Sequence, residues 1–233
     1  VQTVALTATA TPRVREDIVH VLGLRKPKQF MSGFARPNLH FGVVTRPNDR
    51  EKDEELESFL AGMHGSGIIY AATRKRCEAL VDWIGKKLKI SVGAYHAGLM
   101  PDQRRVIQER FMKNELRIIV ATNAFGLGID KPDLRFVIHY NMPGTVEGYY
   151  QEIGRAGRDG EPAETILFYS YADVQTHMHF ADEIQDPRYK EVVIAKRDRI
   201  KEYAEAQVCR RTILLSYFSE ETVEACGNCD VCK

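Results

Sequence analysis

The chain has 233 residues, of which 44% are hydrophobic and 28% are charged, and 33 Lys plus Arg against 32 Asp plus Glu give a net charge of +1. This composition is typical of a globular protein with a substantial core, and it argues against intrinsic disorder and against a highly basic tail. No apolar run approaches the ~18 residues of a membrane span, and the chain does not open with a secretory leader. We therefore expect a cytoplasmic-type protein without a membrane partner.

The first nine residues, VQTVALTAT, alternate apolar and small polar side chains and predict a strand. A helix is expected next, with Thr11 as its N-cap, Pro12 at its first position and Gly23 as its stop signal.

Between residues 39 and 169, short β-branched runs alternate with helical patterns, which predicts an α/β fold with a parallel sheet and helices on both faces. The acidic run at 49–57 is expected to be the solvated face of a helix, and Cys77 a packed core residue. The expected strands are residues 39–44, 67–71, 92–95, 117–121, 135–140 and 165–169, and the expected helices 49–60, 74–89, 101–113 and 146–156.

After residue 171 the pattern is helical, over 172–183, 187–206 and 209–218, so a domain boundary is expected near Ser170. The segment 187–211 carries eight basic and four acidic residues, which makes it a candidate surface for nucleic acid.

Four of the five cysteines lie in the last 25 residues, with the spacing C-x16-C-x2-C-x2-C. Four thiolates complete a tetrahedral zinc shell and leave no position for water, so the site is predicted to be structural. Free cysteines at a chain end are the alternative, and an iron–sulfur cluster is disfavoured because the spacing does not match the common ferredoxin patterns. The predicted ligands are Cys209, Cys226, Cys229 and Cys232.

The segment QEIGRAGRDG (residues 151–160) ends a predicted helix and carries Arg155 and Arg158. Two arginines three residues apart on a helix share a face and can bind one anionic group. The glycines follow a helix rather than a strand, so this is not a dinucleotide-binding fingerprint. A glycine-rich helix end with surface arginines is the alternative.

The segment ATNAFGLGID (121–130) directly follows a predicted strand, where the loops of open parallel sheets bind their ligands. Its backbone N–H groups suit a phosphate or a sugar, and Asp130 could accept a hydrogen bond from a ribose hydroxyl. A plain connecting loop is the alternative.

In their order along the chain, these motifs resemble the RecQ family of superfamily 2 ATP-dependent DNA helicases. The resemblance implies that 1–35 is a remnant of a first RecA-like lobe (its last strand and helix), that 36–170 is the second RecA-like lobe, and that 171–233 is a zinc-binding module. Related RNA helicases share the arginine motif but are not expected to carry this zinc module. The residues that carry the resemblance are ALTATATP (5–12), YAATRKRCEAL (70–80), YHAGL (95–99), ATNAFGLGIDKPDLRFVIHYNMP (121–143), YYQEIGRAGRDG (149–160) and the four cysteines.

The resemblance also implies roles for individual residues. Arg155 and Arg158 would reach the ATP phosphates across the interface between the lobes, one of them as an arginine finger, with Gln151 beside them in catalysis. Asp130 and Gly128 would belong to the same nucleotide site. The residues implied at the DNA backbone are Thr73, Arg74, His96, Thr122 and Asn123, and those implied in coupling hydrolysis to DNA movement are Thr7 and Thr9.

Neither the G-x-x-x-x-G-K-[ST] phosphate loop nor an aspartate–glutamate pair after an apolar strand occurs in the sequence, since Asp53, Glu54 and Glu55 belong to the acidic helix. We therefore expect one structural Zn2+ in this chain, and ATP and Mg2+ only in a full two-lobed protein. The chain alone is expected to lack ATPase and unwinding activity. The resemblance implies 3′-to-5′ movement in that protein and, if it is bacterial, association with the nucleoid.

The expected partners are single-stranded DNA, duplex/single-strand junctions, a first helicase lobe and a winged-helix domain. Three alternatives stay open at this point: a non-catalytic zinc-containing module that binds nucleic acid, an interaction scaffold, and an RNA helicase lobe.

Overall fold

The computed structural model describes residues 3–31, 33–126, 129–220 and 224–233. At its centre lies one six-stranded sheet in which all neighbouring strands are parallel, in the order β1-β6-β5-β2-β4-β3. Each strand predicted between residues 39 and 169 is present, with small differences at the ends. The strands are β1 (Leu39–Thr45), β2 (Ser66–Tyr70), β3 (Val92–Tyr95), β4 (Ile118–Ala121), β5 (Leu134–His139) and β6 (Ala163–Tyr169).

The predicted helices also form, and several begin at a side chain that accepts a hydrogen bond from the first turn, such as Asn48, Thr73, Thr145 and Asp186. The predicted helix 74–89 is α-helical only to Trp83 and ends in a π-helical turn, η1 (Ile84–Leu88). The α-helices are α1 (Pro12–Val21), α2 (Asp49–Gly62), α3 (Arg74–Trp83), α4 (Pro101–Met112), α5 (Val146–Ile153), α6 (Tyr171–Asp182), α7 (Pro187–Glu205) and α8 (Arg210–Tyr217).

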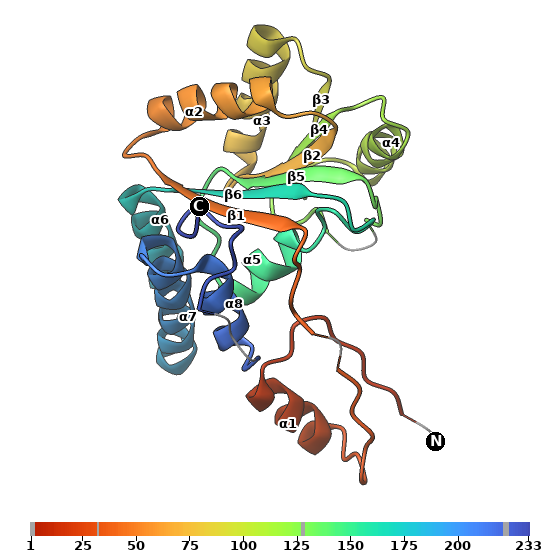
Figure 1. Cartoon of the computed structure of the whole chain (residues 1–233), viewed down its shortest axis with the longest axis vertical. Helices are drawn as coiled ribbons and strands as arrows, with labels where there is room; N and C mark the ends of the chain where they lie inside the picture. The colour runs from red at the N-terminus through yellow and green to blue at the C-terminus, as the bar shows by residue number, and fades with distance from the viewer. Residues whose placement is uncertain (1–2, 32, 127–128, 221–223) are drawn as a thin grey trace.

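Helices cover both faces of the sheet (Figure 1). On one face α2 and α3 bury Leu56, Leu60 and the predicted core residue Cys77 against the strands. On the other face lie α4, α5, α7 and α8, and Tyr149 of α5 and Tyr203 of α7 belong to one buried cluster. The helices after residue 170 therefore share a core with the sheet.

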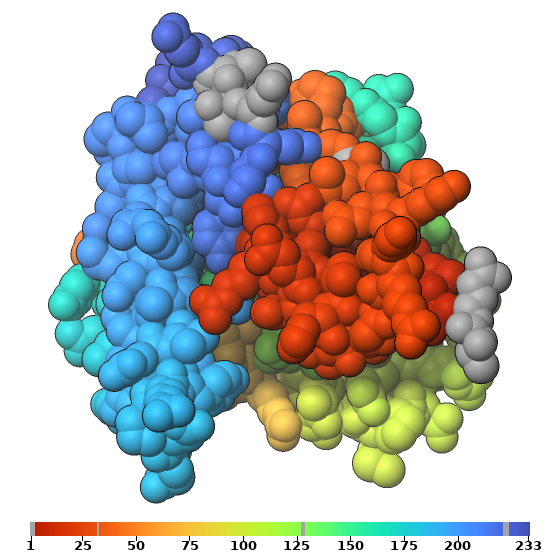
Figure 2. Space-filling model, turned by 90° about the horizontal axis from the view of Figure 1, so that it is seen from below, coloured from red at the N-terminus to blue at the C-terminus, as the bar shows by residue number. Residues whose placement is uncertain are grey.

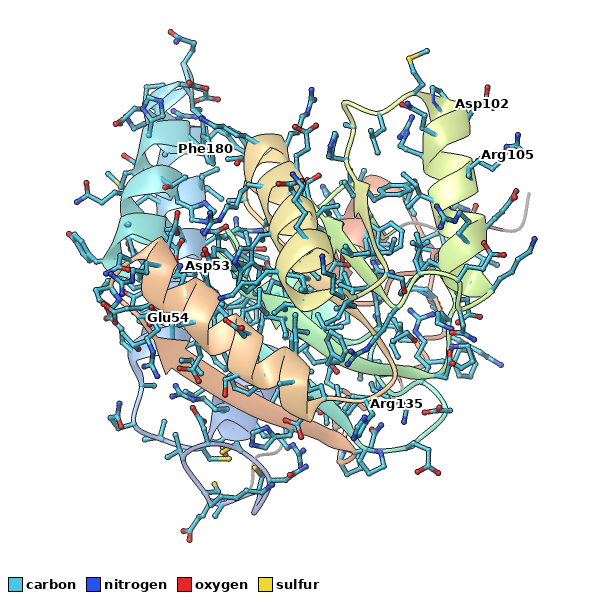
Figure 3. The ribbon with its side chains drawn as sticks, turned by 90° about the horizontal axis from the view of Figure 1, so that it is seen from above. Asp53, Glu54, Asp102, Arg105, Arg135 and Phe180 are labelled. Carbon is cyan, nitrogen blue, oxygen red and sulfur yellow. The ribbon has the colours of Figure 1, made fainter. Side chains whose placement is uncertain are left out.

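The solvated face predicted for the acidic run is present on α2. Figure 3 shows Asp53 and Glu54 on this helix, and Glu54 pairs with Arg50 on its exposed side. Asp53 instead accepts a hydrogen bond from the hydroxyl of buried Tyr140 at 2.8 Å. Glu55 is paired with Arg46 at 2.5 Å. The carboxylates that the sequence offers here are thus engaged with cations and hydroxyls of the chain.

The N-terminal segment differs from the prediction, because residues 3–9 form no strand and residues 1–2 lie outside the described part. An isolated extended segment leaves its N–H and C=O groups without partners, and among the described residues no strand of the sheet pairs with this one. The following helix, α1, buries none of its residues and lies apart from the layers of the sheet (Figure 1). Within the described ranges, no helix has the length and apolarity that crossing a membrane requires.

Candidate helicase and zinc sites

The four C-terminal cysteines converge. Their Sγ atoms all lie within 4.8 Å of one another, with Cys209 and Cys229 buried and the other two half-buried. A tetrahedral Zn–S shell with bonds of about 2.3 Å places its sulfurs roughly 3.8 Å apart, so a small contraction of this cluster would hold Zn2+. Cys209 immediately precedes α8. Burial opposes its ionisation, but hydrogen bonds from Thr212 and Cys226 outweigh that effect and lower the pKa of the Cys209 thiol to about 6.

The knuckle formed by residues 226–233 docks on the edge of the sheet at β1. Asp230 donates its backbone N–H to the carbonyl of Phe41 at 3.0 Å, and its carboxylate accepts from the backbone of Val43 at 2.9 Å. Buried Arg210 of α8 holds the same carboxylate at 2.9 Å. The knuckle is therefore fixed to both the sheet and the helical module.

The two arginines of the glycine-rich motif lie beyond a helix, not on one. Helix α5 ends at Ile153 rather than at residue 156, so the prediction that Arg155 and Arg158 share a helix face is wrong. They lie on an irregular turn, residues 154–161, which we call the arginine turn. Its backbone reverses through Gly157 and Gly160, whose φ angles are +54° and +87°.

Both arginines nevertheless reach one loop. Arg155 donates from Nη1 to the carbonyl of Gly126 at 2.6 Å, and Arg158 donates from Nη1 to Oδ1 of Asp130 at 2.7 Å. The predicted site residue Gly128 lies in this loop but outside the described residues. The structure thus brings Arg155 and Arg158 to the two ends of the loop 126–130, with Arg158 paired to Asp130.

Arg155 lies beside a buried cluster of polar side chains, Tyr70, His139 and Glu152. Its Nε is buried without a hydrogen-bond partner. Next to it, burial and the charge of Glu152 raise the pKa of Tyr70, whereas the positive charge of Arg155 acts in the opposite direction. Glu152 lies 2.7 Å from Nε2 of buried His139, which stacks on the Tyr70 ring. Buried aromatic and charged side chains therefore surround Arg155 on the side of the sheet.

Gln151, predicted to act beside the arginines, contacts one of the predicted coupling residues. Its Nε2 donates to Oγ1 of Thr9 at 2.6 Å, and the backbone N–H of Thr9 in turn reaches Oγ1 of Thr7 at 3.5 Å. The N-terminal segment is therefore tied to α5 one turn before the arginine turn.

The residues predicted at DNA follow the carboxyl ends of β2, β3 and β4, which meet at one edge of the sheet. Arg74 and Asn123 are exposed there, and Thr122 is half-buried. Thr73 is also exposed, but its hydroxyl accepts the N-terminal hydrogen bond of α3. His96 is only 3% exposed, so its ring does not face solvent.

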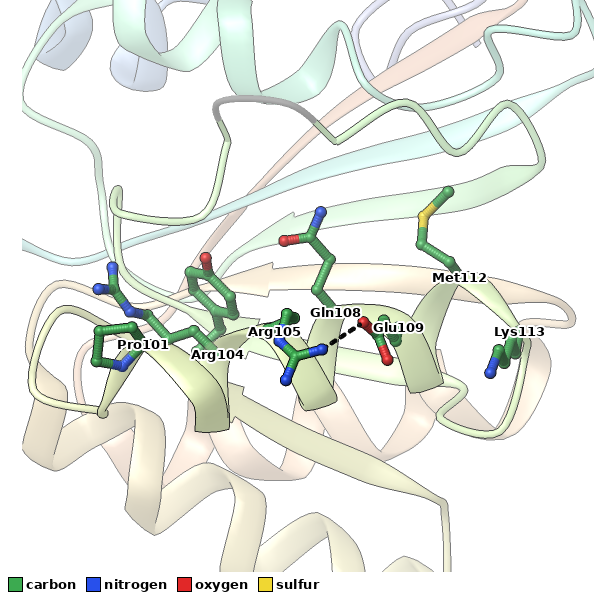
Figure 4. A pocket seen from close by; sticks show the side chains of 8 residues that line it. Pro101, Arg104, Arg105, Gln108, Glu109, Met112 and Lys113 are labelled. Carbon is green, nitrogen blue, oxygen red and sulfur yellow. Dashed lines mark hydrogen bonds and ion pairs between the residues drawn. The ribbon is translucent and has the colours of Figure 1, made fainter.

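A groove of about 430 Å³ runs along α4 beside this edge (Figure 4). Arg104, Arg105 and Lys113 line it together with Tyr95, the last residue of β3. Arg105 is drawn toward Glu109 at 3.5 Å, whereas the Nε of Arg104 is buried without a partner. The groove adds positive charge next to the predicted DNA edge, and no motif in the sequence points to it.

Two other outcomes concern residues that the motifs did not single out. Arg36 and Asn38, which precede β1, bind the arginine turn, and the absence of periodicity in this connecting segment gave no signal for them.

In the basic segment 187–211, Arg210 and Arg211 are engaged within the chain, with Asp230 and with backbone carbonyls. The remaining cations with partners there form the pairs Lys190–Asp182, Lys196–Glu147, Arg197–Asp198, Arg199–Glu202 and Lys201–Glu205.

Known proteins show the same two parts in the same order. Residues 51–160 match the helicase conserved C-terminal domain, and residues 171–233 match the RecQ zinc-binding domain. An ATP-dependent DNA helicase RecQ of Pasteurella multocida is 41% identical over 230 residues, which cover 98% of this chain and 36% of that protein. A protein of Acanthamoeba polyphaga mimivirus, named as an ATP-dependent RNA helicase, is 42% identical over 228 residues, 98% of this chain and 41% of its own length.

The fold has relatives among solved structures as well. A DEAD box protein from the hyperthermophile Methanococcus jannaschii superposes with a TM-score of 0.56 over 80% of this chain and 47% of that one, at 24% identity. The chain is thus a RecA-like helicase C-terminal domain followed by a four-cysteine zinc module. It belongs to the RecQ family, and it spans well under half the length of the curated relatives it matches.

Proposed function

We propose that this chain is the C-terminal part of the core of an ATP-dependent 3′-to-5′ DNA helicase of the RecQ type. The observation that carries the proposal is the convergence of Arg155 and Arg158 on the loop that ends in Asp130. Two guanidiniums held over one loop form a site for a polyanion, and in nucleotide hydrolysis such groups stabilise the charge of the transition state.

In this proposal ATP and Mg2+ bind mainly to a first helicase lobe, and this chain supplies the arginines from the other side. Arg155 is half-buried and is held against the loop by its bond to the Gly126 carbonyl, which makes it the better fixed of the two to act on the transferred phosphoryl group. Arg158 is more exposed. Its guanidinium would break its ion pair with Asp130 and bind the phosphates instead. Closure of the two lobes would bring these donors to the nucleotide and also exclude water.

Single-stranded DNA would cross the carboxyl edge of the sheet, where Arg74 and Asn123 are exposed and the basic α4 groove adjoins. Charged and amide side chains at such an edge bind phosphates without reading the sequence. The contact between Gln151 and Thr9 offers a route by which closure at the nucleotide moves the DNA-binding edge. Such a protein would be associated with the DNA of the cell. Its substrates would be single-strand/duplex junctions, and a winged-helix domain would be a further partner.

The alternative of a non-catalytic nucleic-acid-binding module loses its main support in the structure. Most cations of the segment 187–211 are paired within the chain, which leaves little free positive charge on α7. RNA as the substrate draws support from the name of the viral relative alone. A ribose-dependent affinity would favour RNA, because the 2′-hydroxyl is what distinguishes the two nucleic acids at a given site.

The test is ATP hydrolysis stimulated by single-stranded DNA, measured for this chain and for a longer form that includes a first lobe. The proposal expects no turnover from these 233 residues and turnover from the longer form. In the longer form, Arg155→Ala or Arg158→Ala should lower ATP turnover by about 10³-fold or more while DNA affinity changes little. Arg188→Ala, an exposed arginine on α7, is the matched control. Equal losses of turnover and DNA affinity would contradict the arginine-finger role.

A further inference from the structure

The short segment before β1 binds the arginine turn through a single guanidinium. Arg36 donates from Nη1 to the carbonyl of Gly154 at 3.0 Å, and from Nη2 to the carbonyls of Ala156 at 2.6 Å and Gly157 at 3.0 Å. One side chain thus satisfies three carbonyls of the segment that carries Arg155. These residues are 118 to 121 positions apart in the sequence.

The chemistry of this contact favours arginine. The carbonyls lie at the C-terminal end of α5, where the helix dipole is negative and a cation is stabilised. A planar guanidinium can donate to several carbonyls at once, which the ammonium of lysine cannot do in the same geometry. Burial lowers the pKa of Arg36, and the nearby charge of Arg158 acts in the same direction. Arg36 is therefore held within electrostatic reach of the arginine motif.

Asn38 provides a second contact with the same turn. Its Nδ2 donates to the carbonyls of Gly157 at 2.8 Å and of Glu161 at 2.9 Å. A Cβ added at Gly157 would lie 2.5 Å from this Nδ2 and 2.7 Å from the Glu161 carbonyl. The turn and the segment are thus packed so closely that only glycine fits between them.

The zinc module holds the same segment from its other side. Arg211 of α8 donates from Nη2 to the carbonyls of Arg36 at 3.2 Å and Leu39 at 3.1 Å. Asn228, between two predicted zinc ligands, donates from Nδ2 to the carbonyl of Leu39 at 3.2 Å. Figure 2 shows the N-terminal part of the chain and the C-terminal helices side by side on one face of the molecule.

We propose that Arg36 and Asn38 are positioning residues for the arginine turn, and that the zinc module sets their place through Arg211 of α8 and Asn228 of the knuckle. The zinc site then acts on the arginines at a distance, by ordering the backbone that carries them. The part of the proposal that concerns hydrolysis rests on the proposed function; the ordering of the turn does not.

The first experiment measures amide hydrogen exchange of the 233-residue chain in peptides that cover residues 154–161. The backbone N–H of Gly157 is bonded to Leu134 and that of Asp159 to Pro132, so exchange reports how often the turn opens. Arg36→Ala should accelerate exchange there about tenfold, because charge-assisted hydrogen bonds are lost. Lys28→Ala, an exposed cation of the same N-terminal part, should leave it unchanged. Unchanged exchange in Arg36→Ala would overturn the proposal.

The second experiment separates the knuckle from its metal. Asn228→Ala keeps all four cysteines, so its zinc content should equal that of the wild type while exchange at 154–161 rises. Removal of zinc with a chelator should raise the same exchange further. If the turn stays protected in both cases while exchange at the knuckle itself rises, the knuckle does not position Arg36.

The third experiment uses the two-lobed form. Arg36→Ala should lower kcat for ATP about tenfold with little change in KM, and Arg36→Lys should recover part of the loss, since a cation remains at the helix end. A loss confined to thermal stability would argue for a merely structural residue. If exchange responds as expected but the wild-type two-lobed form hydrolyses no ATP, the positioning of the turn is supported and the proposed function fails.

Discussion

The ion pair between Lys52 of α2 and Asp173 of α6 is almost completely buried, with exposed side-chain fractions of 1% and 4% and an Nζ–Oδ2 distance of 2.8 Å. The two members of the pair differ in the number of further hydrogen bonds that they make. Asp173 also accepts hydrogen bonds from Ser170 and Asn141, whereas Lys52 has one further partner, the carbonyl of Tyr140 at 3.2 Å. We predict that Asp173→Leu, which leaves the ammonium almost alone, destabilises the chain more than Lys52→Met does.

The magnitude follows from the burial. Removal of one member of a buried pair costs about 3–5 kcal/mol, because the other charge remains in a medium of low polarity. For a chain of this size each kcal/mol lowers the melting temperature by about 2–4 °C, so Asp173→Leu should lower it by roughly 6–20 °C. The double variant with Lys52→Met should recover much of this loss, because no unpaired charge is left.

Thermal unfolding followed by circular dichroism measures these differences. The matched control is Lys190→Met, which removes a solvent-exposed ion pair with Asp182 and should lower the melting temperature far less, because water screens the pair. The prediction is wrong if Asp173→Leu melts no lower than Lys190→Met, or if the double variant loses the full sum of the two single effects relative to wild type. Either result would mean that water reaches the ion pair.

The wild-type chain should bind about one zinc, measured by metal analysis, and Cys229→Ser should abolish this binding. The variant should also have a lower soluble yield, since structural zinc contributes to folding. A soluble variant of wild-type stability would contradict a structural site. Gly157→Ala should destabilise the chain by about 1–3 kcal/mol and more than Gly160→Ala, because both residues have positive φ but only Gly157 lacks space for a Cβ; equal melting temperatures would refute this. Burial opposes ionisation of Glu147, but a backbone hydrogen bond and Lys196 outweigh it and hold its pKa below 4.5. Its stabilising effect should therefore be full above pH 4.5 and vanish as the pH falls through the lowered pKa, so the difference in melting temperature between wild type and Glu147→Gln should shrink in that range.

Local patterns were sufficient for the sheet and most helices. Short β-branched runs such as residues 118–121 have no competing helical interpretation when helices with clear caps separate them. The grouping of the four cysteines was also predictable from the sequence, because their spacing is typical of a zinc site.

Features that depend on contacts distant in sequence were not predictable. Arg36 binds the carbonyl of Gly154, directly after the end of α5 at Ile153, from 118 residues away. Residues 3–9 show a strand pattern, but a strand exists only where a neighbour pairs with it. Likewise, the composition of 187–211 does not reveal that most of its cations are paired with carboxylates of the same chain.

The position of the knuckle on β1 has a consequence for the solution behaviour of the protein. Strand β1 lies at one end of the sheet, and the opposite end is the short strand β3. Residues 229–230 occupy backbone groups of β1 that would otherwise face outward, through the bridge to Phe41 and the Asp230 contacts. An uncovered edge strand is a template for another chain, so metal-free protein should self-associate through this edge. The zinc module thereby protects the sheet against edge-to-edge aggregation.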